Sequence, residues 1–160
     1  MASSHPIVRQ VKWLYVIPQF IILILVISVF YFIGAEEPLT FGALTYLIIS
    51  LSMKIFIPKH QRKGMKFIKR GQYEKALQEF QKSYDFFLKY KWIDKYKYLI
   101  LLSASRISYL EMSMLNMAYC HAHLGDGSES KELYQKVLEL FPDSKMAQSA
   151  LKIFDVAKNT

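Results

Sequence analysis

The chain has 160 residues, of which 52% are hydrophobic and 15% aromatic, and it carries a formal net charge of +8. Its length allows one modest domain and an appendage. The charge is local, because residues 53–71 hold seven Lys and Arg and no acid, whereas from Gln72 onward twelve Lys and Arg meet eleven Asp and Glu. One basic cluster argues against a nucleic-acid-binding protein, which spreads its basic residues over a domain face. Cys120 is the sole cysteine, which excludes an internal disulfide.

Most of the excess of hydrophobic residues lies before residue 58, in two apolar runs. The first, 13–33, is uncharged for 21 residues and as a helix would be about 31 Å long, enough to cross a hydrocarbon core of roughly 30 Å. A cleaved signal peptide would have a shorter apolar region and a small-residue cleavage site, so we reject it. The second run, 39–57, is broken only by Lys54, which can snorkel to the headgroups. Because 34–38 is too short for anything but a tight turn, residues 1–57 are predicted to comprise an amino-terminal segment and a two-helix transmembrane hairpin with spans at about 13–33 and 39–57.

Basic residues flank this predicted hairpin on both sides, while its turn contains Glu36 and Glu37. The positive-inside rule therefore places the amino terminus and residues 58–160 in the cytosol, as in an integral membrane protein with two spans. The basic cluster either sets this topology alone or also binds anionic lipid headgroups, and we favour headgroup contact. Its members are Lys54, Lys59, Arg62, Lys63, Lys66, Lys69 and Arg70.

Two later stretches share a pattern of a glycine, a small residue five positions on and an aromatic residue four positions after that. The first has Gly71, Ala76 and Phe80, and the second has Gly125, Ser130 and Tyr134, followed by Pro142. Both resemble the turn and second helix of the tetratricopeptide repeat. Gly64 and Phe67 match the preceding helix of the first unit, and Met114, Met117 and Ala118 match that of the second. The resemblance covers about residues 58–144 and implies an all-α domain of antiparallel helices.

The two stretches start 54 residues apart, at Gly71 and Gly125, instead of the 34 of the family. Residues 94–124 contain no Gly or Pro, so we expect one long helix there, paired with a lengthened helix over about 73–91. Ser103, Ser105 and Ser108 are where this helix would break. After Pro142, Asp143 or Ser144 is expected to cap a last helix reaching about Val156, whose Met146, Ala150, Leu151 and Phe154 would cover the open end of the stack.

Residues 86–98 interleave aromatic side chains with lysines. The preferred interpretation is that these aromatics fill the core of the long helical pair. The alternatives are contact with a membrane or a partner at an interface and, last, stacking on single-stranded nucleic acid.

The resemblance implies a groove along the first helices of the repeats that binds a protein partner. By register this groove would be lined by Met65, Ile68, Met112, Leu115, Tyr119 and His123. On a helix Cys120 and His123 share a face, but no second Cys/His cluster accompanies them, so we expect no metal and no cofactor. Catalytic motifs are absent, and we expect neither an enzyme nor nucleic-acid binding. The sequence indicates neither the partner's identity nor the oligomeric state.

Two hypotheses of function remain. In the first, the chain is a membrane-anchored interaction scaffold or assembly factor, which recruits a protein partner to the cytosolic face. In the second, it is an accessory subunit of a larger membrane complex and packs through its hairpin.

Overall fold

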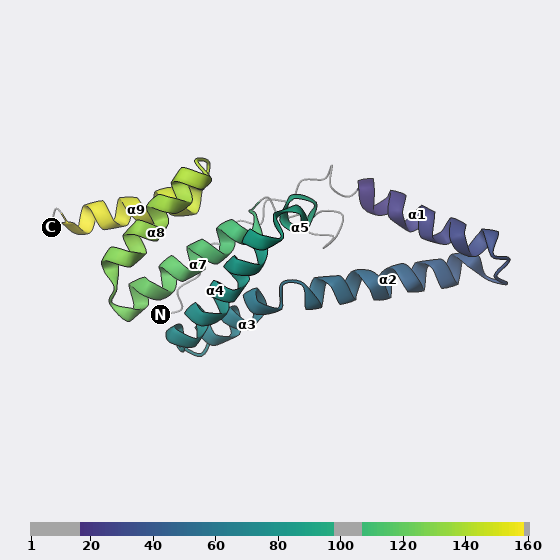
Figure 1. The fold of residues 1–160 in the computed structure, drawn as a ribbon, viewed down its shortest axis with the longest axis horizontal. Helices are drawn as coiled ribbons and strands as arrows, with labels where there is room; N and C mark the ends of the chain where they lie inside the picture. The colour runs from purple at the N-terminus through teal and green to yellow at the C-terminus, as the bar shows by residue number, and fades with distance from the viewer. Residues whose placement is uncertain (1–16, 98–106, 159–160) are drawn as a thin grey trace. The chain divides into compact units, whose positions relative to one another are not determined.

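The computed structural model describes residues 17–97 and 107–158, and in these ranges every regular element is a helix (Figure 1). The chain divides into two compact units. One contains α1 and α2, and the other comprises Pro58–Asp94 and Ile107–Thr160. The helices are α1 (Ile17–Phe32), α2 (Pro38–Phe56), α3 (Lys59–Ile68), α4 (Tyr73–Lys89), α5 (Lys91–Lys95), α7 (Tyr109–Leu124), α8 (Gly127–Leu140) and α9 (Lys145–Lys158).

In the first unit α1 and α2 form an antiparallel hairpin. Gly34 turns the chain with a φ of 75°, a conformation that costs glycine little, and Pro38 begins α2 at a position where a helix tolerates proline. The helices approach most closely at Gly42, where a Cβ would lie 2.7 Å from the Cα of Ile27. Phe30 and Phe41 stack across the same contact, with 6.3 Å between their ring centroids.

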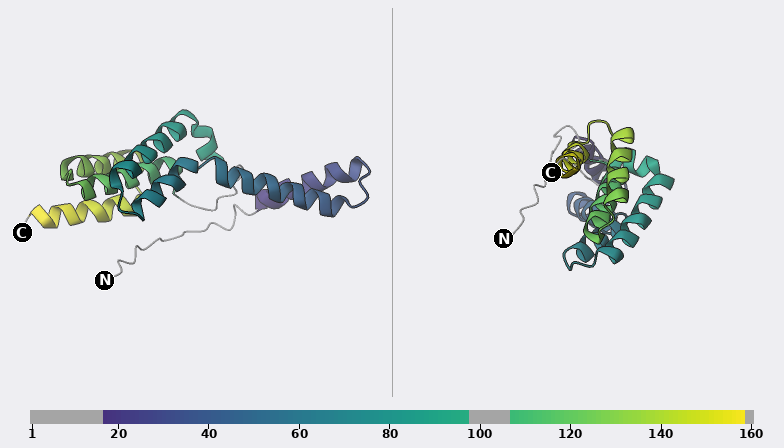
Figure 2. Two further views of the ribbon diagram at one scale, coloured as in Figure 1. Left: turned by 90° about the horizontal axis from the view of Figure 1, so that it is seen from below. Right: turned by 90° about the vertical axis from the view of Figure 1, so that its left-hand side faces the viewer.

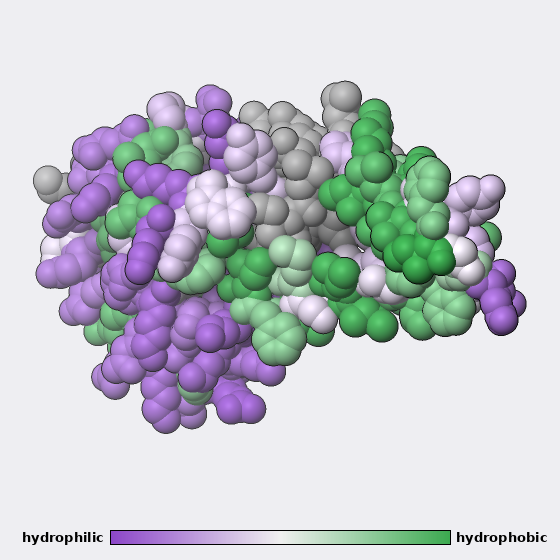
Figure 3. Space-filling view, turned by 45° about the vertical axis from the view of Figure 1, so that its right-hand side comes forward, coloured by the Kyte–Doolittle hydropathy of each residue, from purple (hydrophilic) through white to green (hydrophobic). Residues whose placement is uncertain are grey.

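The apolar side chains of this hairpin face outward. No residue of α1 is buried, and α2 buries only Gly42 and Ser50. Figure 3 shows hydrophobic side chains gathered over the visible face of the hairpin. By length and composition α2, with 19 residues, can cross a membrane, whereas α1 has 16 residues in the described range and falls short of the same measure. Residues 13–16 of the first predicted span lie outside the described residues.

The second unit is an array in which α3, α4, α7, α8 and α9 follow one another, each antiparallel to the next (Figures 1 and 2). Gly71 and Gly125 end α3 and α7 with φ values of 69° and 89°, as left-handed glycines commonly do at helix carboxyl ends. Two buried clusters hold the array together. One consists of Ala76, Phe80, Met117 and Cys120, and the other of Met114, Leu115, Ala118, Tyr134, Val137 and Ala147.

The helix expected over 94–124 is not continuous, and it breaks at Ser108, one of the three serines at which a break was expected. Helix α4 ends at Lys89, α5 ends at Lys95 and α7 begins at Tyr109, while residues 98–106 lie outside the described ranges. Hydrogen bonds to the first amides of α7 account for its start. Asp94 carboxylate oxygens accept from the N–H groups of Tyr109 and Leu110 at 2.9 and 3.0 Å, and Ser108 Oγ accepts from Glu111 N at 2.9 Å. These amides have no partner within the helix, so the two side chains stabilise its amino end.

Replacing Asp94 with alanine should lower the free energy of unfolding of the second unit by about 2 kcal/mol, since two charge-assisted hydrogen bonds are lost. Amide hydrogen exchange followed by mass spectrometry should show faster exchange at residues 109–111. The control is Asp143→Ala, because Asp143 is exposed. Equal exchange in the two variants would contradict this role of Asp94.

The last helix and the aromatic segment depart from expectation in part. In α9, Ala150, Leu151 and Phe154 pack on the second buried cluster, but Met146 is 53% exposed. Ser144 Oγ makes no hydrogen bond and does not cap α9.

The aromatic–lysine segment contains both core and surface side chains. Between residues 86 and 97, Phe87 and Ile93 are buried as core residues, whereas Leu88 and Trp92 are exposed. Residue 98 lies outside the described ranges.

Candidate functional site

The first glycine–aromatic pair of the repeat pattern forms a close contact between α3 and α4. A Cβ on Gly64 would lie 2.6 Å from Cε1 of Phe80, whose side chain is fully buried. Ala76 is buried in the same cluster, and Phe67 and Ile68 pack at its edge. The small residue therefore lets α3 approach the ring that fills the space between the helices.

The corresponding residues of α7 and α8, each 54 positions later, occupy the same roles. Ala118 is fully buried, and Tyr134 packs in its cluster at 9% exposure. Ser130 Oγ donates to the carbonyl oxygen of Ala118 at 2.8 Å, which holds α8 directly against α7. Helix α8 ends at Leu140, and Pro142 follows with its carbonyl accepting from Gln148 Nε2 at 2.9 Å.

The predicted groove residues fall into three groups. Met65 and Ile68 pack at the edge of the first cluster, and Met112 is half-buried in the first turn of α7. Leu115 is only 5% exposed, and it belongs to the second cluster together with Ala147 of α9. In this structure Leu115 is thus a core residue and offers no surface to a partner.

Tyr119 and His123 lie together with Tyr73, the first residue of α4. The imidazole of His123 stacks on the ring of Tyr73, with 4.4 Å between centroids and 6° between planes, and it lies 4.4 Å from the ring of Tyr119. Burial, followed by the proximity of Tyr73, raises the pKa of Tyr119. This aromatic cluster leaves His123 exposed at the end of α7.

Helices α4 and α7 also enclose a shallow, open depression. Its lining residues are Leu77, Gln78, Gln81 and Lys82 from α4, and Met117 and His121 from α7. Leu77 and Met117 supply apolar surface while the others are polar, and the depression is wide open to solvent, so it fits a protein segment better than a small molecule. The sequence offered no signal for it, because its two walls come from helices joined by a long connection.

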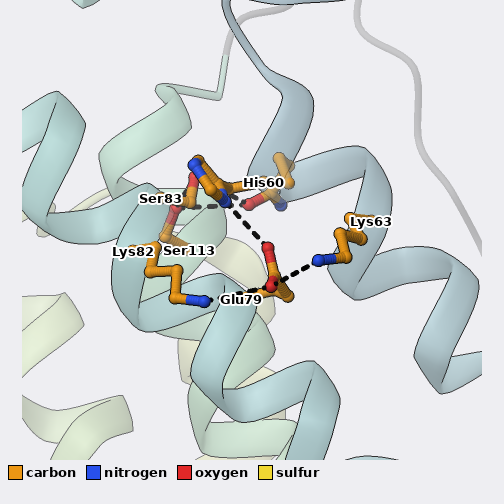
Figure 4. Close-up of polar contacts among 7 residues, drawn as sticks. His60, Lys63, Glu79, Lys82, Ser83 and Ser113 are labelled. Carbon is orange, nitrogen blue, oxygen red and sulfur yellow. Dashed lines mark hydrogen bonds and ion pairs between the residues drawn. The ribbon is translucent and has the colours of Figure 1, made fainter.

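A buried carboxylate, Glu79, ties α3 to α4 (Figure 4). Its side chain is 6% exposed, and its oxygens lie 2.7 Å from His60 Nδ1, 2.9 Å from Lys63 Nζ and 3.2 Å from Lys82 Nζ. Burial alone would raise the pKa of Glu79, but the hydrogen bonds from His60, Lys63 and Lys82 outweigh burial and lower this pKa to about 2. Lys63 of α3 thus binds a buried carboxylate of α4.

A second polar group lies nearby and joins three helices. Ser83 Oγ of α4 and Ser113 Oγ of α7 are 2.9 Å apart. They lie 3.3 and 3.2 Å from Oε1 of Gln61, in the first turn of α3. All three residues are at most 4% exposed, so the hydroxyls give α3, α4 and α7 a fixed register where a wholly apolar contact would not.

The outer face of α3 carries most of the predicted headgroup-binding residues. Lys59, Arg62, Lys66 and Lys69 recur at helical spacing and are exposed, as is Arg70. Lys54 is exposed in the last turn of α2. Lys63 differs, because its ammonium bonds to Glu79 while its side chain stays 58% exposed.

The Cys/His stretch of α7 is accommodated by packing. Cys120 is fully buried, which raises the pKa of its thiol to about 11. His121 Nδ1 lies 3.3 Å from a carboxylate oxygen of Asp126, and His123 stacks on Tyr73. These three side chains thus have separate surroundings.

The helix–turn–helix formed by α7 and α8 has the length, turn and small–aromatic contacts of one repeat. Residues 112–144 match the family model described as a tetratricopeptide repeat. The chain therefore carries one tetratricopeptide repeat, and this suggests protein partners. No curated protein and no solved structure matches the chain significantly.

Proposed function

We propose that this protein is a membrane-anchored, non-enzymatic scaffold or assembly factor, which holds a tetratricopeptide-like unit at the cytosolic face and recruits a protein partner there. The observation that carries the membrane part is the outward-facing apolar surface of the hairpin. A core helix of a water-soluble protein would be mostly buried, whereas only 11% of the apolar window of α2 is buried. Exposed apolar area on this scale is costly in water, and lipid would cover it.

The partner-binding part rests on the repeat and on the surfaces beside it. We propose that α3–α4 acts as a second, divergent repeat, since its Gly64–Phe80 contact and left-handed Gly71 correspond to Ala118, Tyr134 and Gly125. Exposed His123, half-buried Met112 and the Leu77–Met117 depression then offer apolar and aromatic contacts to a peptide segment.

The orientation follows from charge. Six basic residues between Lys59 and Arg70 would adjoin the end of α2, while Glu36 and Glu37 would lie at the opposite side of the bilayer. The positive-inside rule then puts the second unit in the cytosol, where its exposed α3 lysines and arginines contact anionic headgroups.

An accessory subunit of a membrane complex is the second candidate function. It is favoured by the close contact at Gly42, because a tightly packed hairpin presents a fixed apolar surface to other spans. On this proposal, Phe20 and Ile48 would contact protein, whereas a scaffold would leave them in lipid.

Photo-crosslinking of the full-length protein in native membranes separates these functions. A photoreactive residue at Gln78 or His123, and separately at Phe20 or Ile48, reports the neighbour of each surface. The scaffold predicts a protein adduct from Gln78 and His123 and lipid adducts from Phe20 and Ile48, and the accessory subunit predicts protein adducts from the hairpin. Ser149, exposed on α9, is the matched control position. Release of the protein by alkaline carbonate would contradict both.

A further inference from the structure

One end of the second unit is defined by the start of α3. Gln61, in the first turn of α3, lies beside Ser83 in the second half of α4 and Ser113 in the first half of α7. Phe87 stacks on Tyr109 at 4.8 Å, and Asp94 binds the first amides of α7. The end of α4, the whole of Lys91–Asp94 and the start of α7 therefore lie at the end of the unit where the chain enters through Pro58.

This entry end displays Trp92, which is 57% exposed. Its two successors in the chain, Ile93 and Asp94, are 8% and 9% exposed, and the Asp94 carboxylate is hydrogen-bonded to α7. The backbone is thus held in place while the indole points outward. Leu88, at 40% exposure, adds a second uncovered apolar side chain at this end.

Basic residues accompany these apolar side chains. Lys89 and Lys91 are exposed, and Lys89 Nζ lies 5.5 Å from the ring centroid of Tyr90. Lys59 and Arg62 begin the basic face of α3 at the same end. An exposed indole among lysines is the combination that suits the boundary between headgroups and acyl chains, and it is electrostatically attracted to anionic lipid.

The chain itself limits how far this end can be from a bilayer. Helix α2 ends at Phe56 and α3 begins at Lys59, so two residues, with a reach of about 10 Å, join them. A second unit tethered to a membrane-spanning α2 therefore has its entry end beside the headgroups.

We infer that Trp92, with Leu88, inserts into the interface of the bilayer that α2 crosses, and that Lys89 and Lys91 bind its headgroups. This inference rests on the proposed membrane anchoring. The insertion holds the entry end of the second unit on the membrane.

The chain has two tryptophans, Trp13 and Trp92, so Trp13→Phe leaves Trp92 as the sole indole reporter. The full-length variant is reconstituted into vesicles of phosphatidylcholine and phosphatidylserine. Its fluorescence is then quenched by lipids brominated near the headgroup and, separately, by aqueous iodide. The matched control carries Trp13→Phe, Trp92→Phe and Ile153→Trp. Ile153 is 70% exposed on α9, next to Phe154, whose ring lies 3.9 Å from a Cβ built on Gly127 at the opposite end of the unit.

Trp92 should lose about half of its emission to the brominated lipid and show an iodide quenching constant at least about twofold below that of the control. The control should be quenched by iodide and not by bromine. Equal iodide quenching of the two reporters, or no bromine quenching of Trp92, in protein that floats with the vesicles would overturn the insertion and leave the anchoring intact. Failure of the protein to float with the vesicles would overturn the anchoring, and the insertion with it.

Discussion

Replacing Gly64 with valine should lower the free energy of unfolding of the second unit by about 3 kcal/mol. The reason is steric, because a Cβ at position 64 would lie 2.6, 2.7 and 2.9 Å from three ring atoms of Phe80. That ring is fully buried against Ala76, Met117 and Cys120 and has no free space to enter. A domain of this size has only a few kcal/mol to lose, so urea unfolding of the full-length protein in detergent micelles, followed by circular dichroism, should show a large shift of the midpoint.

Two further variants distinguish crowding from a general effect of losing a helical glycine. At Gly127 the nearest atom to a built Cβ is at 3.9 Å, so Gly127→Ala should be neutral or slightly stabilising. Adding Phe80→Leu to Gly64→Ala should cost less than the sum of the two single changes, because the smaller side chain makes room for the methyl group. Additive costs would show that the ring of Phe80 is not what position 64 meets.

The helices of the second unit show which features the sequence can and cannot predict. The turn glycines and the small–aromatic spacing are local signals, and they correctly predicted the helical hairpins around Gly71 and Gly125. The sequence offered Ser108 as one of three places for a break but did not select it, because apolar residues continue at helical spacing before α7. Ser108 and Glu111 match a capping-box spacing, yet the other capping residue, Asp94, lies 15 positions upstream, and no local pattern pairs it with Tyr109.

The surroundings of Leu115 and Glu79 depend on tertiary contacts that the spacing of residues in the sequence does not reveal. Leu115 has the register of a groove residue, but the docking of α9 brings Ala147 into its cluster and closes that position. Glu79 lies beside the buried stripe of Ala76, Phe80 and Ser83, where an acid requires a partner. From the sequence, any of the seven Lys and Arg in residues 53–71 could pair with this acid. Only the packing of α3 on α4 shows that Lys63 does so.

Replacing Glu79 with glutamine should lower the free energy of unfolding at neutral pH by about 2 kcal/mol. The difference between the ordinary pKa of 4.5 and the folded value of about 2 corresponds to about 3 kcal/mol at most. Lys63 and Lys82 are 58% and 56% exposed, so solvent screening reduces this gain. Glutamine keeps the shape of the side chain but presents no charge to the three donors, while Glu132→Gln, at an exposed position of α8, removes a charge without such partners.

The pH dependence of the stability difference between Glu79→Gln and the unsubstituted protein shows whether the ionised carboxylate causes it. Because the folded pKa of Glu79 lies below the unfolded one, the carboxylate contributes its full stabilisation above about pH 4.5 and loses it as the pH falls towards about 2. The stability of the unsubstituted protein should therefore decrease over this interval relative to Glu79→Gln, until the two converge. Urea unfolding between pH 7 and pH 2 measures this, and the Glu132→Gln profile should run parallel to that of the unsubstituted protein. A constant gap between Glu79→Gln and the unsubstituted protein down to pH 2 would mean that shape and packing, not the ion pairs with α3, make this carboxylate stabilising.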